Sequence, residues 1–238
     1  MIRRFNRTEG KVLEKIPGQD RLAFAMSGTE DFYDLIAWSE RGGYQGSIIL
    51  FYDFDNGEVY QPFGKKRNVV YGNPVFSDGF YYFLQGDYDE NRITLYKYLP
   101  WEREKEKGRE KDIETDEMTG GGQILEPVMC FKADDVNLYN LRIIGDKIHV
   151  ISQDEIFRCY YPEQFSFALD PHETVCFIEE GKVYIEAWVE EGWDDENECA
   201  TDEYRYYDKV IIKDFDGRLL SEETGSLFQA SDGMWWIS

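Results

Sequence analysis

Short apolar runs separated by turn residues recur along most of the chain. In four places an apolar run reaches a turn that contains or ends at glycine, and a second apolar run follows: residues 74–84, 141–151, 175–185 and 227–238. Three of these turns hold an Asp-Gly or Gly-Asp pair, which tolerates the positive φ that two-residue hairpin turns require. Each place is therefore predicted to be a β-hairpin. A fifth copy, residues 21–26 followed by residues 34–38, has a longer turn between its two predicted strands.

A second hairpin pattern alternates with the first. Residues 48–60 and 210–220 each hold two apolar runs around an Asp-Asn-Gly or Asp-Gly turn, and residues 2–16 form a third example that bends at Thr8-Glu9-Gly10. Residues 93–99 and 155–161 read as the corresponding third strands of the other two units. The chain is thus predicted to contain five inner and five outer pairs of strands.

This alternation resembles the four-stranded blades of β-propellers, although no family-specific motif accompanies it. Once the charged residues 101–123 are set aside, the turn glycines at 79, 145, 181 and 233 are spaced by 36 to 52 residues, close to blade length. We therefore expect residues 1–238 to form one all-β domain, a five-bladed β-propeller of four-stranded antiparallel blades. The ring would close where N-terminal outer strands pair with C-terminal inner strands. The rival architecture is a β-sandwich.

Charge narrows the range of partners. The chain holds 26 basic and 48 acidic residues, a net charge of −22, which repels nucleic acid and anionic lipid. Nucleic acid and membrane are therefore not expected as partners. The expected partner is an unidentified protein or carbohydrate, and the protein is expected to be a monomer.

The cysteines and the first residues bear on location. The four cysteines show no Cys-x-x-Cys spacing, which is typical of reduced thiols in a cytoplasmic protein. Polar residues follow the basic residues 1–7 where a secretory signal would be apolar, so we expect a cytoplasmic location. Residues 102–117 hold eight acidic and five basic residues, and the whole stretch 101–123 is predicted to be a flexible, charged insertion.

The candidate ligand-binding residues lie in loops on the face where propellers gather ligands. Residues 190–208, interpreted as the longest of these loops, combine carboxylates with aromatic rings, as a sugar site does. We select Trp193, Asp194 and Asp195 there. Four further candidates come from other loops of the same face: Tyr44, Asp87, Asp89 and Asp134.

The chemistry available to these residues is limited. Residues 87–91 alternate oxygen ligands as calcium loops do, but they lack the glycine and the distant glutamate of an EF-hand, so no specific metal or cofactor is expected. His149 and His172 have no nucleophile partner in any recognisable motif. The expected function is a non-enzymatic binding or protein-interaction platform. The alternative is a carbohydrate-active propeller, either a lectin-like binder or a glycoside hydrolase, and the hydrolase would need two converging carboxyls.

Overall fold

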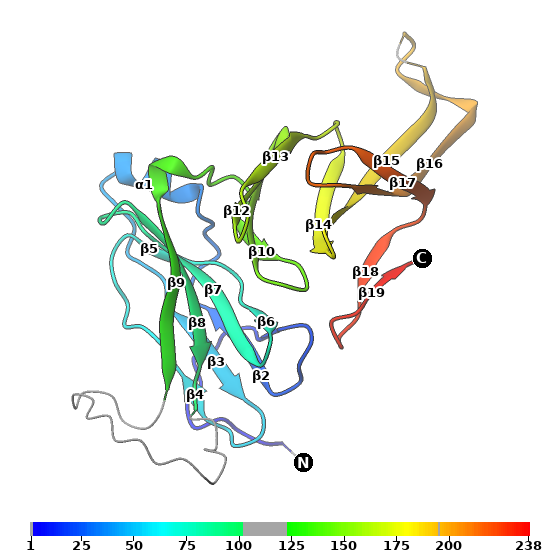
Figure 1. The fold of residues 1–238 in the computed structure, drawn as a ribbon. Coiled ribbons are helices and arrows are strands. Elements are labelled where there is room, and N and C mark those ends of the chain that lie inside the picture. Colours follow the sequence, from blue (N-terminus) through cyan, green and yellow to red (C-terminus); the bar gives the residue numbers. More distant parts are fainter. Residues whose placement is uncertain (1, 102–122, 195) are drawn as a thin grey trace. The chain divides into compact units, whose positions relative to one another are not determined.

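The computed structural model describes residues 2–101, 123–194 and 196–238 (Figure 1). The chain forms two compact units, which are taken separately below: unit 1 holds Met1–Ile16 and Asp20–Ala133, and unit 2 holds Pro17–Gln19 and Asp134–Ser238. All of the sheets are antiparallel. The charged insertion predicted over residues 101–123 lies, apart from its two end residues, outside the described residues.

The first sheet of unit 1 is a four-stranded meander in chain order. It comprises β1 (Glu14–Lys15), β2 (Leu22–Met26), β3 (Ile49–Asp53) and β4 (Val59–Tyr60). All of β3 is buried, and the fully buried Asp53 carboxylate that ends it accepts hydrogen bonds from Arg21 at 2.9 and 3.1 Å. The Asp53–Gly57 turn is closed by a 2.8 Å bond from the Gly57 amide to the Asp53 carbonyl. The hairpin predicted over residues 48–60 is confirmed.

The second sheet of unit 1 carries longer strands. β5 (Val69–Tyr71) and β6 (Val75–Ser77) both pair with β7 (Phe80–Asp87), which is followed by β8 (Arg92–Leu99) and β9 (Ile124–Lys132). The hairpin predicted over residues 74–84 and the strand predicted over residues 93–99 are therefore confirmed. Aromatic rings from both sheets form the core, with Phe51 lying 4.9 Å from Tyr98 and 5.9 Å from Phe83.

Two predictions in unit 1 are wrong. The strand predicted over residues 34–38 is a helix, α1 (Asp34–Glu40), and the Asp31 carboxylate accepts the amide hydrogens of Tyr33 and Asp34 just before and at its start. The hairpin predicted over residues 2–16 is reduced to β1. Asn6 instead lies along the outer edge of β4, where it donates to the Gly57 carbonyl at 2.8 Å and accepts from the Val59 amide.

Unit 2 contains two four-stranded meanders. The first comprises β10 (Arg142–Ile144), β11 (His149–Gln153), β12 (Ile156–Tyr161) and β13 (Phe165–Ala168), and a 3-10 turn, η1 (Ala133–Asp135), precedes it. The second comprises β14 (Glu173–Glu179), β15 (Lys182–Asp194), β16 (Cys199–Lys213) and β17 (Leu219–Thr224). Their apolar faces share one core, and Arg142 of the first donates a 2.7 Å hydrogen bond to the Val175 carbonyl of the second.

The last sheet of unit 2 has only two strands, β18 (Leu227–Gln229) and β19 (Trp235–Ile237). The ring of Trp235 stacks on Phe177 at 4.9 Å, and the Gly18 amide donates to the Ser231 carbonyl in the β18–β19 turn. The hairpins predicted over residues 141–151, 175–185, 210–220 and 227–238 are thus confirmed. No helix among the described residues is long and apolar enough to cross a membrane.

Candidate functional site

The sequence predicts a loop over residues 190–208, but the structure forms a β-ribbon there. β14 pairs with β15 only as far as Ala187, and β17 pairs with β16 only over Lys209–Lys213. Residues 188–208 are called the arm from here on. At its base the Trp188 amide donates to the His172 carbonyl and the Asp208 carbonyl accepts from the Gly225 amide, but beyond this base the two strands are paired only with each other and project past the ends of β14 and β17 (Figure 1). A two-stranded ribbon of this kind is marginally stable alone.

An irregularity at Gly192 sets the path of the arm. The register shifts between Glu191 and Trp193, and Gly192 has a φ of +75°. A Cβ atom at this position would lie 2.7 Å from the backbone carbon and oxygen of Glu203. The Thr201 hydroxyl donates a 2.8 Å hydrogen bond to the Gly192 carbonyl. Glycine is required here both by the positive φ and by the close approach of the opposite strand.

The predicted ligand residue Asp194 ends β15 and organises the turn at the tip of the arm. Its carboxylate accepts hydrogen bonds from the amides of Glu196 and Asn197, and from the Asn197 side chain at 2.8 Å. These bonds lower the pKa of Asp194. Asp195, selected with it, lies outside the described residues.

Aromatic rings form a series along the arm, which we call the aromatic face and define as Trp193, Tyr204 and Tyr206. Trp193 meets Tyr204 edge-on at 6.0 Å, and Tyr204 lies 6.4 Å from Tyr206. The Tyr204 hydroxyl donates a 2.7 Å hydrogen bond to Glu190, which fixes one ring beside a carboxylate. Tyr206 is 68% exposed, so the face is open to a partner.

A polar network stiffens the arm around Glu191. Its carboxylate accepts from the Arg205 guanidinium at 2.6 Å and from the Tyr207 hydroxyl at 2.9 Å. The hydrogen bond from Arg205, followed by that from Tyr207, lowers the pKa of Glu191. The only basic residue of the arm is thereby engaged within it.

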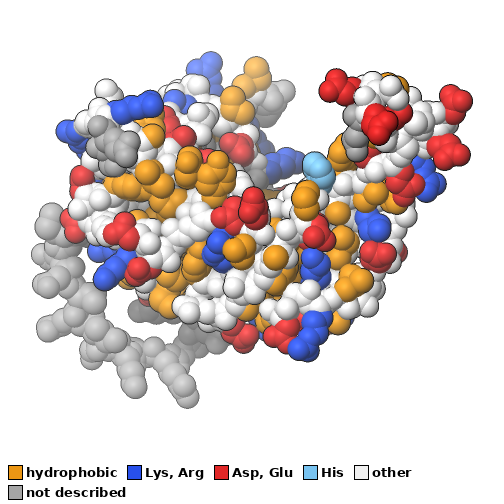
Figure 2. Space-filling view, turned by 90° about the horizontal axis from the view of Figure 1, so that it is seen from above, with side chains coloured by type: hydrophobic (Ala, Val, Ile, Leu, Met, Phe, Trp, Pro, Cys, Tyr) orange, Lys and Arg blue, Asp and Glu red, His pale blue; other side chains and the backbone are white. Residues whose placement is uncertain are grey.

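The remaining charge of the arm is negative and exposed. Residues 188–208 contain nine acidic residues against Arg205 alone. Glu196, Glu198, Asp202 and Glu203 are exposed, and Figure 2 shows acidic side chains gathered on the projecting part of unit 2. The arm thus presents a row of rings bordered by carboxylates.

Three other predicted ligand residues meet in one cluster of unit 1, where Asn68 joins their loops. Its side chain accepts from the Tyr44 amide and donates to Asp89, both at 2.7 Å, while Lys66 binds Asp87 at 2.6 Å. The buried Tyr44 hydroxyl donates to Glu30 at 2.6 Å, and burial followed by this bond raises the pKa of Tyr44. The hydrogen bonds of Tyr44, Asp87 and Asp89 thus hold neighbouring loops of unit 1 together.

Asp134, the last predicted ligand residue, is exposed in η1. Among the residues that the structure describes, no group of three or more histidine, cysteine or acidic side chains could hold a metal ion.

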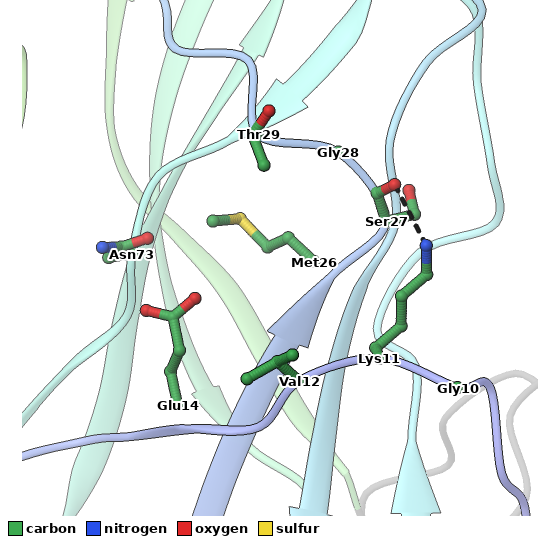
Figure 3. A pocket seen from close by; sticks show the side chains of 9 residues that line it. All are labelled: Gly10, Lys11, Val12, Glu14, Met26, Ser27, Gly28, Thr29 and Asn73. Carbon is green, nitrogen blue, oxygen red and sulfur yellow. Dashed lines mark hydrogen bonds between the residues drawn. The ribbon is translucent and has the colours of Figure 1, made fainter.

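Sequence reasoning missed a cavity of about 500 Å³ in unit 1 (Figure 3). Met26 points into it, and Glu14, Thr29 and Asn73 contribute polar groups. Its lining comes from separate segments, so no local pattern marks it. Glu14 is the one carboxylate of the lining and no aromatic ring contributes, so the cavity lacks both the stacking ring of a sugar site and the carboxyl pair of a glycosidase.

Comparison with protein-family models, with curated proteins and with solved structures gives no match for this chain.

Proposed function

We propose that the protein is a non-enzymatic interaction platform whose arm binds a basic, arginine-containing segment of a protein partner. The observation that carries this proposal is the arm itself, a self-paired ribbon that exposes a row of rings and a surplus of carboxylates. Exposed Trp and Tyr supply rigid contact area at protein interfaces, where aromatic residues are enriched.

The scaffold is proposed to be a five-bladed β-propeller. The repeated antiparallel meanders and the β18–β19 hairpin supply five sheets, which supports five blades. The hydrogen bond from Gly18 to Ser231 supports closure of the ring through residues 17–19, next to the C-terminal hairpin. The N-terminal residues were predicted to pair with the C-terminal hairpin, but Asn6 bonds to the edge of β4 instead. We therefore propose that the ring closes through residues 17–19. A reducing, cytoplasmic location is proposed as well, since all four cysteines are free thiols.

Arginine suits this surface better than lysine does. A guanidinium can stack on an aromatic ring and bind a carboxylate through two parallel hydrogen bonds, whereas an ammonium group acts as a point charge. The arm offers both features side by side, because Glu190 lies opposite Tyr206 in the ribbon. A preference for arginine peptides over lysine peptides would therefore indicate a site with specific geometry. Non-specific attraction to a protein of net charge −22 would favour neither peptide.

The shape of the arm favours a protein over a carbohydrate or an enzymatic function. Small-ligand sites are concave and bury most of their ligand, whereas a projecting two-stranded ribbon has no enclosing walls. A glycosidase also needs a carboxyl whose pKa is raised. Glu191 and Asp194 have lowered pKa values, the opposite of a general acid.

The test compares oligoarginine and oligolysine peptides of equal length by isothermal titration calorimetry at physiological salt. We expect oligoarginine to bind more tightly. Tyr206→Ser should weaken its binding by about tenfold, the cost of one lost cation–π contact of roughly 1–2 kcal/mol. Trp236→Ser is the matched control, because Trp236 is similarly exposed (61%) but lies in β19, outside the arm.

A second pair of variants separates local from overall charge. Asp202→Asn with Glu203→Gln removes two charges from the arm, and Glu155→Gln with Glu163→Gln removes two exposed charges elsewhere. Only the first pair should weaken oligoarginine binding appreciably. Equal binding of the two peptides, with both variant pairs equivalent, would refute the proposed site. Binding of a neutral oligosaccharide that Tyr206→Ser abolishes would favour the lectin-like alternative.

A further inference from the structure

The β18–β19 hairpin presents a neutral, apolar surface on a strongly anionic protein. Residues 226–238 contain a single charged residue, Asp232. Phe228 and Trp236 face each other across the two strands, and each is 61% exposed. Two copies of a chain that carries a net charge of −22 repel each other over most of their surface, and this hairpin is a place where they can approach.

One edge of this hairpin is occupied at Leu227, and no partner strand for the other edge is found among the described residues. The Leu227 amide on the β18 side donates a 2.7 Å hydrogen bond to the Glu186 carboxylate, which hinders the addition of a strand there. Ser226 and Ser238 exchange backbone hydrogen bonds at 3.1 and 3.0 Å. Because amides alternate in direction along a strand, those of Trp235 and Ile237 point away from β18. In the part of the chain that the structure describes, no backbone acceptor is found for either amide.

We propose that β19 pairs antiparallel with β19 of a second copy and so joins two hairpins into one four-stranded sheet. Among the described residues, the other four sheets each have four strands or more, whereas an isolated two-stranded hairpin is marginally stable. Since the Glu186 carboxylate occupies the β18 edge at Leu227, we expect strand addition on the β19 side, where it closes as a symmetric dimer instead of growing into a fibre. The proposed dimer differs from the monomer expected from the sequence.

We choose the register that uses both outward amides of each copy, because it forms the most hydrogen bonds. Trp235 of one copy lies opposite Ile237 of the other, and the two such pairs exchange four backbone hydrogen bonds. Trp236 then lies opposite Trp236 of the second copy in a non-hydrogen-bonded pair, with the Cα atoms about 4.5 Å apart. The apolar rings of Phe228 and Trp236 continue across the joined sheet on one face.

Disulfide trapping tests the register. In a background with Cys130→Ser and Cys199→Ser, which removes the two exposed thiols, Trp236→Cys should form a covalent dimer on mild oxidation. A Cα separation of about 4.5 Å lies within the range that a disulfide spans. Phe228→Cys is the matched control, because its exposure is the same but three strand spacings of about 4.8 Å would separate the two thiols. It should form no covalent dimer under the same conditions.

Analytical ultracentrifugation of the unmodified protein over a concentration series tests the dimer independently of any variant. We expect a reversible monomer–dimer equilibrium, and the Trp235 and Ile237 amides should gain protection from hydrogen exchange as concentration rises. Ile237→Pro removes two of the four interface hydrogen bonds and should weaken dimerisation by about tenfold or more. A monomer at every concentration would overturn the proposal, and so would equal cross-linking of the two cysteine variants. Amides that are protected in a monomer would show that a segment of the same chain covers this edge. Tyr206→Ser should leave the dimer intact, which separates this site from the arm.

Discussion

Replacing Gly192 by alanine should loosen the arm without unfolding the sheet that carries it. A non-glycine residue at a φ of +75° costs about 1 kcal/mol. The added Cβ atom would also lie 2.7 Å from the Glu203 backbone, which must move, and overpacking of this kind typically costs about 1–3 kcal/mol. The total of about 2–4 kcal/mol is large for a ribbon that is paired only with itself.

Gly181→Ala is the matched control for this prediction. Gly181 has nearly the same φ, +76°, and lies in the turn between β14 and β15, but a Cβ atom there meets nothing within 4 Å. Both variants therefore carry the backbone strain, and only Gly192→Ala carries the clash.

Hydrogen exchange followed by mass spectrometry is the appropriate assay. In Gly192→Ala, the amides that point across the ribbon, those of Val189, Glu191, Arg205 and Tyr207, should exchange at least tenfold faster, while those of β14 and β17 keep their protection. Gly181→Ala should lower the thermal midpoint of the whole protein and leave the protection of the arm relative to its sheet unchanged. Arm amides that exchange at the wild-type rate in Gly192→Ala would refute the argument.

Three further predictions follow from buried and titratable groups. Lys213→Met should lower the free energy of unfolding by about 3–5 kcal/mol, because it leaves the buried Glu173 carboxylate without the ammonium group 2.8 Å away. In urea denaturation, adding Glu173→Gln to this variant should recover part of the lost stability. No recovery would contradict the pairing of Glu173 with Lys213. The pKa of Glu191 is lowered in the folded arm, so its stabilisation is complete above the ordinary glutamate pKa of about 4.3 and is lost as the pH falls through the folded value. The near-ultraviolet circular dichroism signal of the aromatic face should fall as the arm loses this stabilisation at acid pH. Glu191→Gln should abolish the pH dependence of that signal. A signal that falls when the pH is raised would contradict the prediction. Burial raises the pKa of Cys159 to about 12 and that of Cys176 to about 11, so maleimide should label two thiols quickly and two only after unfolding, the fast pair being the exposed Cys130 and Cys199. Four equally fast thiols would show that the core is open.

The hairpins could be predicted because their turns carry their own signal. Asp-Gly pairs and the apolar runs around them determine the local conformation, so the strands of 74–84 and 210–220 are found where they were expected. The strand predicted over residues 34–38 is wrong because the four consecutive apolar residues 35–38 have no period that distinguishes a strand from a helix. Asp31, whose carboxylate accepts two amide hydrogens in the turn before α1, was a local signal that a helix could begin here.

The ligand-binding role of the candidate residues stays a prediction. The sequence assigned the loops of Tyr44, Asp87 and Asp89 to one face, and Asn68 joins these loops in the structure. Their partners, Glu30, Lys66 and Asn68, come from separate segments, and no spacing rule identifies them. The arm was interpreted as a loop because its acidic composition obscured the aromatic residues that favour strands. The bulge at Gly192, which interrupts the alternation, added to this error.

The measurement that tests the proposed function most directly is the affinity of a variant that lacks most of the arm. Residues 190–206 can be replaced by Asn-Gly between Val189 and Tyr207. The Trp188 amide points to the His172 carbonyl, so Val189 and Tyr207 form the next hydrogen-bonded pair, which suits a two-residue turn. We predict that this variant folds with an unchanged thermal midpoint and loses the preference for oligoarginine over oligolysine. A folded variant that keeps the full preference would contradict the assignment of binding to the arm.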